Sequence, residues 1–249
     1  MDSFAYAITD LDGLVQVIRI YQPEADSLDS ILQSDDALNA PYAKVNIGIA
    51  EKAPVLVPAK LYNPLEKLAY LRHLSPLPIE NADIQSEELA DIGCFALYAL
   101  PEWAKNLRRF FPGARIMHLA TALIKNCRHW PAPATPLDPR LIVHVGTSDV
   151  LVLLFSADRL VLCNTYPYSA AEDFLYYLLL AIAQEGFDNN QTPVYLSGSI
   201  VEDSTVYRII QRFFKKTNFI QIPEDWPKGA KTLQSPAHFF FALLCLRQC

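Results

Sequence analysis

The sequence lacks the short patterns that mark several common enzyme sites. It contains no GxSxG, Walker A or HExxH pattern, so the signatures of serine hydrolases, P-loop nucleotide hydrolases and zinc proteases are missing. Its five cysteines are an odd number and form no CxxC pair, which argues against a disulfide framework or a zinc site. We expect reduced, mostly buried thiols in a cytoplasmic protein, and no metal site.

Long hydrophobic runs and an excess of positive charge are missing as well. The longest apolar stretch, residues 174–183, is far shorter than the ~20 residues that span a bilayer. Residues 1–4 do not resemble the start of a signal peptide. The formal net charge is −6, whereas a general nucleic-acid binder needs a basic surface. These features predict no membrane insertion and no nucleic-acid partner.

The chain does have a core-forming composition arranged in two similar halves. Hydrophobic residues make up 51% of its 249 residues, enough for a globular α/β fold. Hydrophobic periodicity and turn residues predict the elements of each half. In the first half we predict strands over residues 4–9, 14–21, 44–50, 93–100 and 114–118, helices over 65–74, 102–111 and 120–127, and an exposed loop over 76–88. In the second half we predict strands over 141–145, 150–155, 160–166, 193–196 and 219–222, and helices over 170–184, 204–215 and 236–247.

The repeated order suggests a duplicated, two-lobed architecture. Each half reads as three strands, a helix, a strand and a helix, or βββαβα. A proline-rich segment separates the halves. We therefore predict a first lobe over residues 1–130, a linker over 131–140 and a second lobe over 141–249. A cleft between two such lobes is the kind of place that holds a nucleotide.

This order resembles the actin-like ATPase superfamily, in which two ribonuclease-H-like lobes clasp ATP. In that superfamily a hairpin that opens each lobe touches phosphate, and a later glycine turn of the second lobe cradles the adenosine. The matching segments are residues 10–13, 144–149 and 196–199. The resemblance implies nucleotide-binding positions at Asp12, Gly13, Gly146, Thr147, Ser148, Gly198 and Ser199.

More specifically, the whole chain resembles a bacterial family of unknown function, the domain-of-unknown-function family 3822. The resemblance depends on Leu-Cys-Asn-Thr-Tyr-Pro-Tyr at 162–168, which runs into Ala-Glu-Asp-Phe-Leu-Tyr-Tyr at 171–177. Segments 195–200 and 237–243 support it. That family has no assigned reaction, so the resemblance implies a fold and no substrate.

Two departures from the actin-like pattern indicate a degenerate site. His144 stands where those ATPases carry an acidic residue that holds magnesium or its waters, and imidazole is a poor magnesium ligand. Ser199 stands where the pattern has a second glycine. A glycine there would let the backbone approach the nucleotide most closely. We therefore predict a non-hydrolysing binding or scaffold protein with no catalytic residue and no cofactor. The alternative is an active Mg-ATP-dependent ATPase or phosphotransferase, with Asp149 acting from the far side of the turn.

A third hypothesis comes from the first strand. The run that ends in Asp10-Leu11-Asp12-Gly13 looks like the nucleophile strand of haloacid-dehalogenase-type phosphatases, which would make Asp10 the nucleophile and Asp12 the acid. Leu14 replaces the threonine of that pattern, and the chain continues as a strand where that family loops out. A hairpin turn explains the same four residues.

The remaining polar and aromatic features have structural explanations. We expect Asn164 to bond backbone at a strand end, and Glu172 and Asp173 to favour the positive N-terminus of a helix. Histidines without acid or cysteine partners at motif spacing should be packing or surface residues, namely His118, His129 and His238. Three consecutive phenylalanines, 239–241, cannot share one helix face, so one should meet the other lobe or a partner. A protein partner or a homodimer is expected.

Overall fold

The computed structural model describes residues 3–21, 28–74, 83–130, 139–224, 226 and 236–249. In the first half the strands are β1 (Phe4–Thr9), β2 (Val15–Tyr21), β3 (Asn46–Ile49), β4 (Val55–Pro58), β5 (Asp83–Leu89), β6 (Cys94–Leu100) and β7 (Arg115–His118). The helices there are α1 (Leu28–Ser34), α2 (Lys67–Leu74), α3 (Glu102–Phe110) and α4 (Leu119–Cys127). The second half has strands β8 (Pro139–Val145), β9 (Asp149–Ser156), β10 (Arg159–Pro167), β11 (Val194–Gly198) and β12 (Thr217–Phe219). Its helices are α5 (Ala171–Gln184), α6 (Thr205–Phe213), the 3₁₀ helix η5 (Ala237–Phe240) and α7 (Phe241–Arg247).

The second half is built on one five-stranded sheet in the order β10-β9-β8-β11-β12. β9 pairs antiparallel with both β8 and β10, whereas β11 runs parallel to β8 and β12. β8 and β9 are near-continuous apolar runs because both faces of the sheet are covered. Along β8, Val143 joins the core on one face and Ile142 joins the core on the other.

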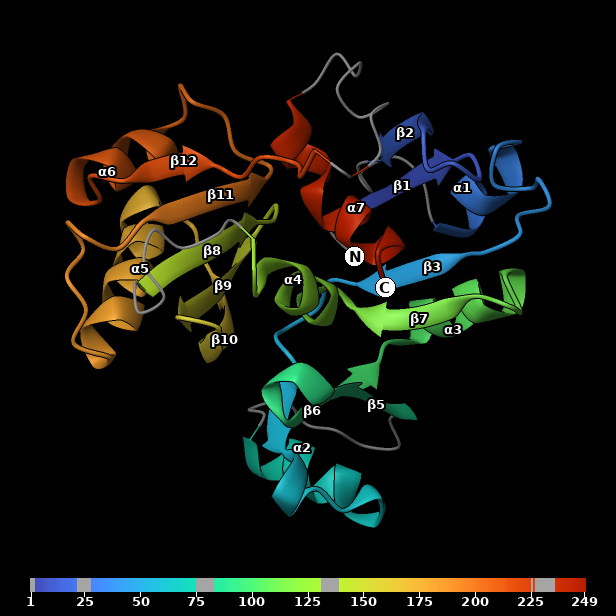
Figure 1. The fold of residues 1–249 in the computed structure, drawn as a ribbon. Helices are drawn as coiled ribbons and strands as arrows, with labels where there is room; N and C mark the ends of the chain where they lie inside the picture. The colour runs from blue at the N-terminus through green and yellow to red at the C-terminus, as the bar shows by residue number, and fades with distance from the viewer. Residues whose placement is uncertain (1–2, 22–27, 75–82, 131–138, 225, 227–235) are drawn as a thin grey trace.

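Four helices cover the two faces of this sheet (Figure 1). Phe174 of α5 and Ile210 of α6 pack on one face, and Leu123 of α4 and Phe241 of α7 pack on the other. The predicted acidic start of α5 is confirmed, because Asp173 Oδ2 accepts hydrogen bonds from the two preceding turn amides, at 3.1 Å each. This stabilises the helix N-terminus.

The first half opens with the predicted hairpin, β1 paired antiparallel with β2. Gly13 occupies its turn with φ of +88°, a backbone conformation that favours glycine. β3 and β7 form a short parallel pair. A core of side chains from β1, α1, β3, β6 and α3 joins these pieces.

A buried carboxylate fixes α1 to the hairpin. Asp35 accepts hydrogen bonds from Tyr6 Oη at 2.5 Å, from Tyr21 Oη at 2.6 Å and from Arg19 Nη1 at 2.7 Å. Burial by itself would raise the pKa of Asp35, but the hydrogen bonds from Tyr21, Tyr6, the Ala37 amide and Arg19 outweigh it and lower that pKa to about 2. Asp35 is therefore ionised at neutral pH and holds three side chains in place.

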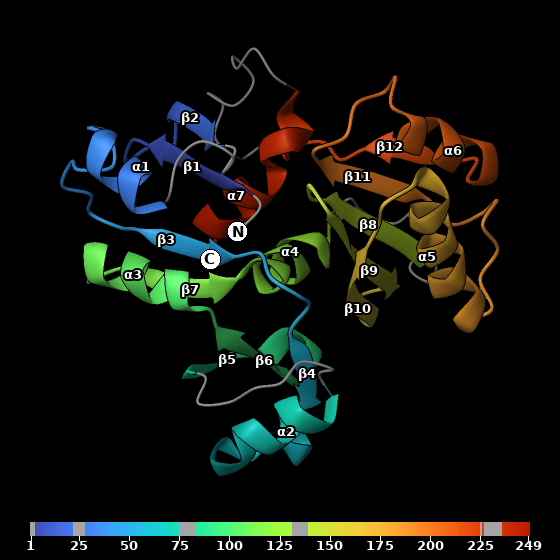
Figure 2. The same ribbon diagram turned by 180° about the vertical axis from the view of Figure 1, so that it is seen from behind.

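A small three-stranded sheet extends from the first half. Its order is β4-β6-β5, antiparallel throughout, and α2 packs against it (Figure 2). Asn63 begins this helical region, as predicted, because its side chain accepts a hydrogen bond from the Leu65 amide. The prediction of an exposed loop over 76–88 is wrong for residues 83–88, which belong to β5; residues 76–82 lie outside the described part of the chain. The strand forms because β6 offers an edge, although its own sequence is polar.

The C-terminal helix lies between the halves. α7 contacts β11 of the large sheet and also β1 and β3 of the first half. Asn46 Nδ2 of β3 donates to the carbonyl oxygen of Leu246 at 2.7 Å. Phe241 is buried in a cluster that includes Met117 from the first half, as expected for one of the three phenylalanines.

Arg140 makes a second connection between the two halves, and its side chain is fully buried. It donates to the carbonyl oxygens of Cys127 and Arg128 at the end of α4, and to that of Ala157 in the β9–β10 turn. Its charge also lies 5.0 Å from the ring centre of Phe155. β8 begins at Pro139, two residues before the predicted start, and residues 131–138 of the predicted linker lie outside the described residues. Within the described part of the chain, no helix is both long and apolar enough to cross a bilayer.

Candidate functional site

The hairpin between β8 and β9 turns at Gly146, Thr147 and Ser148. The Gly146 amide donates to the carbonyl oxygen of Asp149 at 2.9 Å. Tyr168 stabilises the turn with two hydrogen bonds. Its amide donates to the carbonyl oxygen of Ser148 and its hydroxyl donates to that of Gly146, both at 3.1 Å. Thr147 and Ser148 are exposed. The turn is therefore rigid at its base and open at its tip.

The second glycine turn follows β11 and lies against the end of β8. Gly198 has a φ of +85°, and a Cβ there would overlap the carbonyl oxygen of Val145. The Ser199 amide donates to that same oxygen at 2.8 Å. Because β8 and β11 are parallel, with Val145 in register with Gly198, both glycine turns lie at the same edge of the sheet. The structure thus places Gly146 and Gly198 close to each other, and their role in binding a nucleotide stays a prediction.

His144 and Ser197 form a polar pair beneath these turns. His144 Nδ1 lies 3.1 Å from Ser197 Oγ, and that hydroxyl is 3.4 Å from the carbonyl oxygen of Val143. With the serine donating to Val143, the imidazole donates from Nδ1. Burial lowers the pKa of His144 to about 4. His144, which the resemblance aligns with an acidic residue, is therefore a neutral imidazole.

Asp149 is the carboxylate nearest to the second-half turn in sequence. Its Oδ1 would lie 2.5 Å from a Cβ placed on Gly146, so the side chain folds back over the glycine. Gly146 therefore has to be small in order to accommodate this carboxylate. Within the described part of the chain, no group of three His, Cys, Asp or Glu side chains is arranged to hold a metal ion.

The first-half turn has a neighbour that the sequence did not reveal. A Cβ on Gly13 would overlap the guanidinium of Arg247, at the end of α7. Gly13 is buried under this side chain, whereas Asp12 is exposed at the tip of the turn. The structure thus places Gly13 against α7 and leaves Asp12 facing solvent.

Asp10 is used inside the hairpin. Its carboxylate accepts hydrogen bonds from the Leu14 amide at 2.7 Å and from Gln16 Nε2 at 3.0 Å. These bonds fix the turn, which is the structural explanation of the Asp-Leu-Asp-Gly pattern. β1 also pairs with β2 in a simple hairpin, so the geometry favours a turn role over the phosphatase hypothesis.

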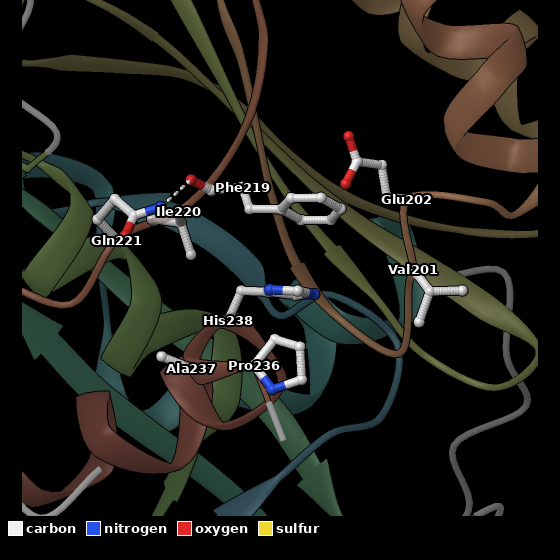
Figure 3. Close-up of a pocket in the computed structure, with 8 residues that line it drawn as sticks. All are labelled: Val201, Glu202, Phe219, Ile220, Gln221, Pro236, Ala237 and His238. Carbon is white, nitrogen blue, oxygen red and sulfur yellow. Dashed lines mark hydrogen bonds between the residues drawn. The ribbon is translucent and has the colours of Figure 1, made fainter. Parts of the chain in front are cut away.

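A cavity of about 370 Å³ opens beside the second glycine turn. Figure 3 shows the rings of Phe219 and His238 lying face to face, with Gln221 on one side and Glu202 on the other. The two ring centres are 4.1 Å apart, and His238 Nε2 donates to the carbonyl oxygen of Ile200 at 2.8 Å. Burial lowers the pKa of His238. The cavity is lined by Val201, Glu202, Phe219, Ile220, Gln221, Pro236, Ala237 and His238.

None of the predicted nucleotide-binding residues lines this cavity. It begins two residues after Ser199, at the carboxyl ends of β11 and β12, where ligands of open α/β sheets bind. The sequence predicted a packing or surface role for His238, and the structure shows that it is buried and stacked on Phe219. Phe219 ends a three-residue strand. Its contact with His238 could not be predicted from the local sequence pattern.

Comparisons with known proteins place the chain by family and by fold. The family model described as "Protein of unknown function (DUF3822)" matches residues 4–217. No curated protein matches the chain. A solved structure from Bacteroides thetaiotaomicron VPI-5482, a protein with an actin-like ATPase fold and unknown function, is 19% identical with a TM-score of 0.79. The match covers 100% of this chain and 92% of that one.

A chain of a PilM-PilN type IV pilus biogenesis complex is also similar. It is 13% identical with a TM-score of 0.56, and the match covers 98% of this chain and 94% of that chain. At such identities the likeness shows the fold alone. The predicted actin-like ATPase fold is therefore confirmed. Since the family model matches most of its length, the chain belongs to the DUF3822 family of proteins of unknown function.

Proposed function

We propose that the protein is a non-hydrolysing binding or scaffold protein, whose actin-like nucleotide cleft is degenerate. The observation that carries the proposal is His144. A half-buried, neutral imidazole occupies the position where the resemblance implies a carboxylate. Magnesium prefers hard oxygen ligands, so this position does not hold Mg²⁺ or orient its waters.

The first-half turn supports the same conclusion. In the actin-like pattern this turn approaches a phosphate. Here the Arg247 guanidinium covers Gly13, so the chain's own C-terminal helix takes the space beside the glycine. Ser199 adds a side chain where the pattern has a second glycine. Two substitutions, His144 and Ser199, and the covering of Gly13 by Arg247 together favour loss of the original chemistry.

A scaffold role is supported by analogy at the level of fold. The similar chain of the PilM-PilN complex belongs to a type IV pilus biogenesis assembly, so this fold is found in a protein complex. Fold does not determine function, and the analogy supplies no partner for this chain. We retain the division into lobes 1–130 and 141–249, and the cytoplasmic location, as parts of the proposal.

The second candidate is an active Mg-ATP-dependent ATPase or phosphotransferase. The adjacency of the Gly146 and Gly198 turns at one sheet edge favours it, because backbone amides can still approach phosphate there. In that case Asp149, folded over Gly146, is the residue that would take the place of the missing acid.

Phosphate release from Mg-ATP separates the two candidates. We expect the purified protein and an Asp149→Ala variant to release phosphate at the same background rate. Turnover that is present in the native protein and lost in Asp149→Ala would establish the ATPase instead. A His144→Asp variant serves as the matched gain-of-function control. If the missing acid is the main defect, it should bind Mg-ATP more tightly than the native protein.

A further inference from the structure

β10 forms an open edge of the large sheet. It is nine residues long and, among the described residues, pairs only with β9. At about 3.3 Å per residue it presents roughly 30 Å of backbone. The backbone groups on the outer side of such a strand are a template for another extended chain.

This edge carries few of the features that prevent pairing. Natural edge strands are protected by charges, prolines, bulges or short length. In β10 the only charged residue is Arg159 at its start, and the only proline is Pro167 at its end. The single shift of register lies between Leu160 and Leu162, which leaves the rest of the strand regular.

Thr165 identifies a free outer position of the edge. Its amide donates to the side-chain oxygen of the preceding residue, Asn164 Oδ1, at 2.9 Å. An amide that faces β9 would donate to that strand, so the Thr165 amide lies on the outer side. Asn164 is exposed and can swing away, which would release this donor to an incoming strand.

A group of tyrosines lies beside the same edge. Tyr166 of β10 stacks on Tyr177 of α5 with ring centres 4.4 Å apart, and Tyr177 meets Tyr176 edge-on at 5.5 Å. Tyr176 remains 60% exposed. Exposed tyrosine is enriched at protein interfaces, because it supplies a large rigid surface with a polar end. The polar edge and the aromatic surface are continuous.

We propose that two copies of the chain associate by antiparallel pairing of their β10 edges, with the tyrosine group packing at the margins of the paired strands. A second copy fits for two reasons. The strand between Leu160 and Tyr166 is uncharged, so pairing two β10 strands sets no like charges opposite each other along this stretch, although each chain has a net charge of −6. In addition, two-fold antiparallel pairing puts the two Arg159 side chains at opposite ends of the new ladder. The large sheets of the two copies then become one continuous sheet.

Sedimentation velocity of the full chain between about 1 and 100 µM tests the proposal, since specific interfaces commonly have dissociation constants in or below this range. We expect a dimer for the native protein and for Thr165→Val, which keeps the amide. Thr165→Pro removes the outer donor and should give a monomer. Tyr176→Glu should weaken the dimer at least tenfold.

Two results would overturn the proposal. One is a native protein that is monomeric throughout the range, which would leave an extended segment of another protein as the occupant of the edge. The other is a dimer that persists in both Thr165→Pro and Tyr176→Glu, which would place the interface elsewhere. Should circular dichroism show that Thr165→Pro is unfolded, Tyr176→Glu decides, because its side chain is on the surface. Neither result depends on whether the protein hydrolyses ATP.

Discussion

Replacing Arg140 by methionine tests how the two halves are joined. The buried guanidinium donates to three carbonyl oxygens, of Cys127, Arg128 and Ala157. Leaving a buried acceptor unsatisfied costs about 1–3 kcal/mol, and the contact with Phe155 adds about 1 kcal/mol. The bond to Cys127 is buried and those to Arg128 and Ala157 are part-buried, so we take the lower limit for the latter two.

The loss of a buried charge works in the opposite direction. Burial lowers the pKa of Arg140, which shows that its charged form is desolvated, and methionine removes that cost. Three acceptors at about 1 kcal/mol each and the ring contact at about 1 kcal/mol, less the desolvation cost that methionine relieves, give a predicted loss of about 3 kcal/mol of unfolding free energy. For a chain of this size that corresponds to a fall in Tm of about 6–12 °C.

Urea and thermal unfolding followed by circular dichroism measure this effect. Arg159→Met is the matched control, since Arg159 is exposed at the start of β10, and should change stability by less than about 0.5 kcal/mol. Arg140→Lys should lose at least as much as Arg140→Met, because it keeps the buried charge but cannot reach carbonyls on both sides. A loss below about 1 kcal/mol in Arg140→Met would refute the reasoning, since desolvation would then cancel the hydrogen bonds.

Three further predictions concern backbone geometry and pH. Gly198→Ala should lower the free energy of unfolding in urea by about 2 kcal/mol or more, because Gly198 has a positive φ and an added Cβ would overlap the carbonyl oxygen of Val145. Gly113→Ala is the control and should be near neutral, because no atom lies within reach of an added Cβ there. Ala157→Gly should raise stability by about 0.5–1 kcal/mol in the same assay, because Ala157 has a φ of 54°; no gain would mean that the turn tolerates alanine. Asp35 has its pKa lowered to about 2, so its stabilising effect is complete above its unfolded pKa of about 4 and is lost as the pH falls through about 2. Unfolding free energies measured between pH 5 and 2 should fall less steeply for Asp35→Asn than for the native chain, and equal slopes would contradict the assignment.

The elements that the sequence predicted well are those with strong local signals. β8 and β9 are apolar on both faces, α6 begins after the capping residue Ser204, and Gly186 follows α5 with a positive φ. In each case a few neighbouring residues determine the structure. β5 shows the opposite case. Its sequence is mostly polar, and it is a strand because it pairs with β6 along its length.

In the candidate site, too, some features could be predicted from the sequence and others depend on tertiary contacts. Gly146 and Gly198 were singled out because their segments match the turns of the actin-like pattern, and the parallel pairing of β8 with β11 places them side by side. Arg247 could not be placed from sequence, since its contact with Gly13 joins opposite ends of the chain. The stack of His238 on Phe219 is likewise a contact between segments that have no local pattern in common. Such contacts arise only from tertiary packing.

Isothermal titration of the purified chain with Mg-ATP and Mg-ADP tests the central claim most directly. With a neutral imidazole at His144 and Arg247 over the Gly13 turn, we predict no binding heat at millimolar nucleotide. Gly198→Ala should behave identically to the native protein in this titration, provided that it folds. Micromolar binding of Mg-ATP by the native chain, lost in Gly198→Ala, would contradict the account and show that the glycine turns still hold a nucleotide.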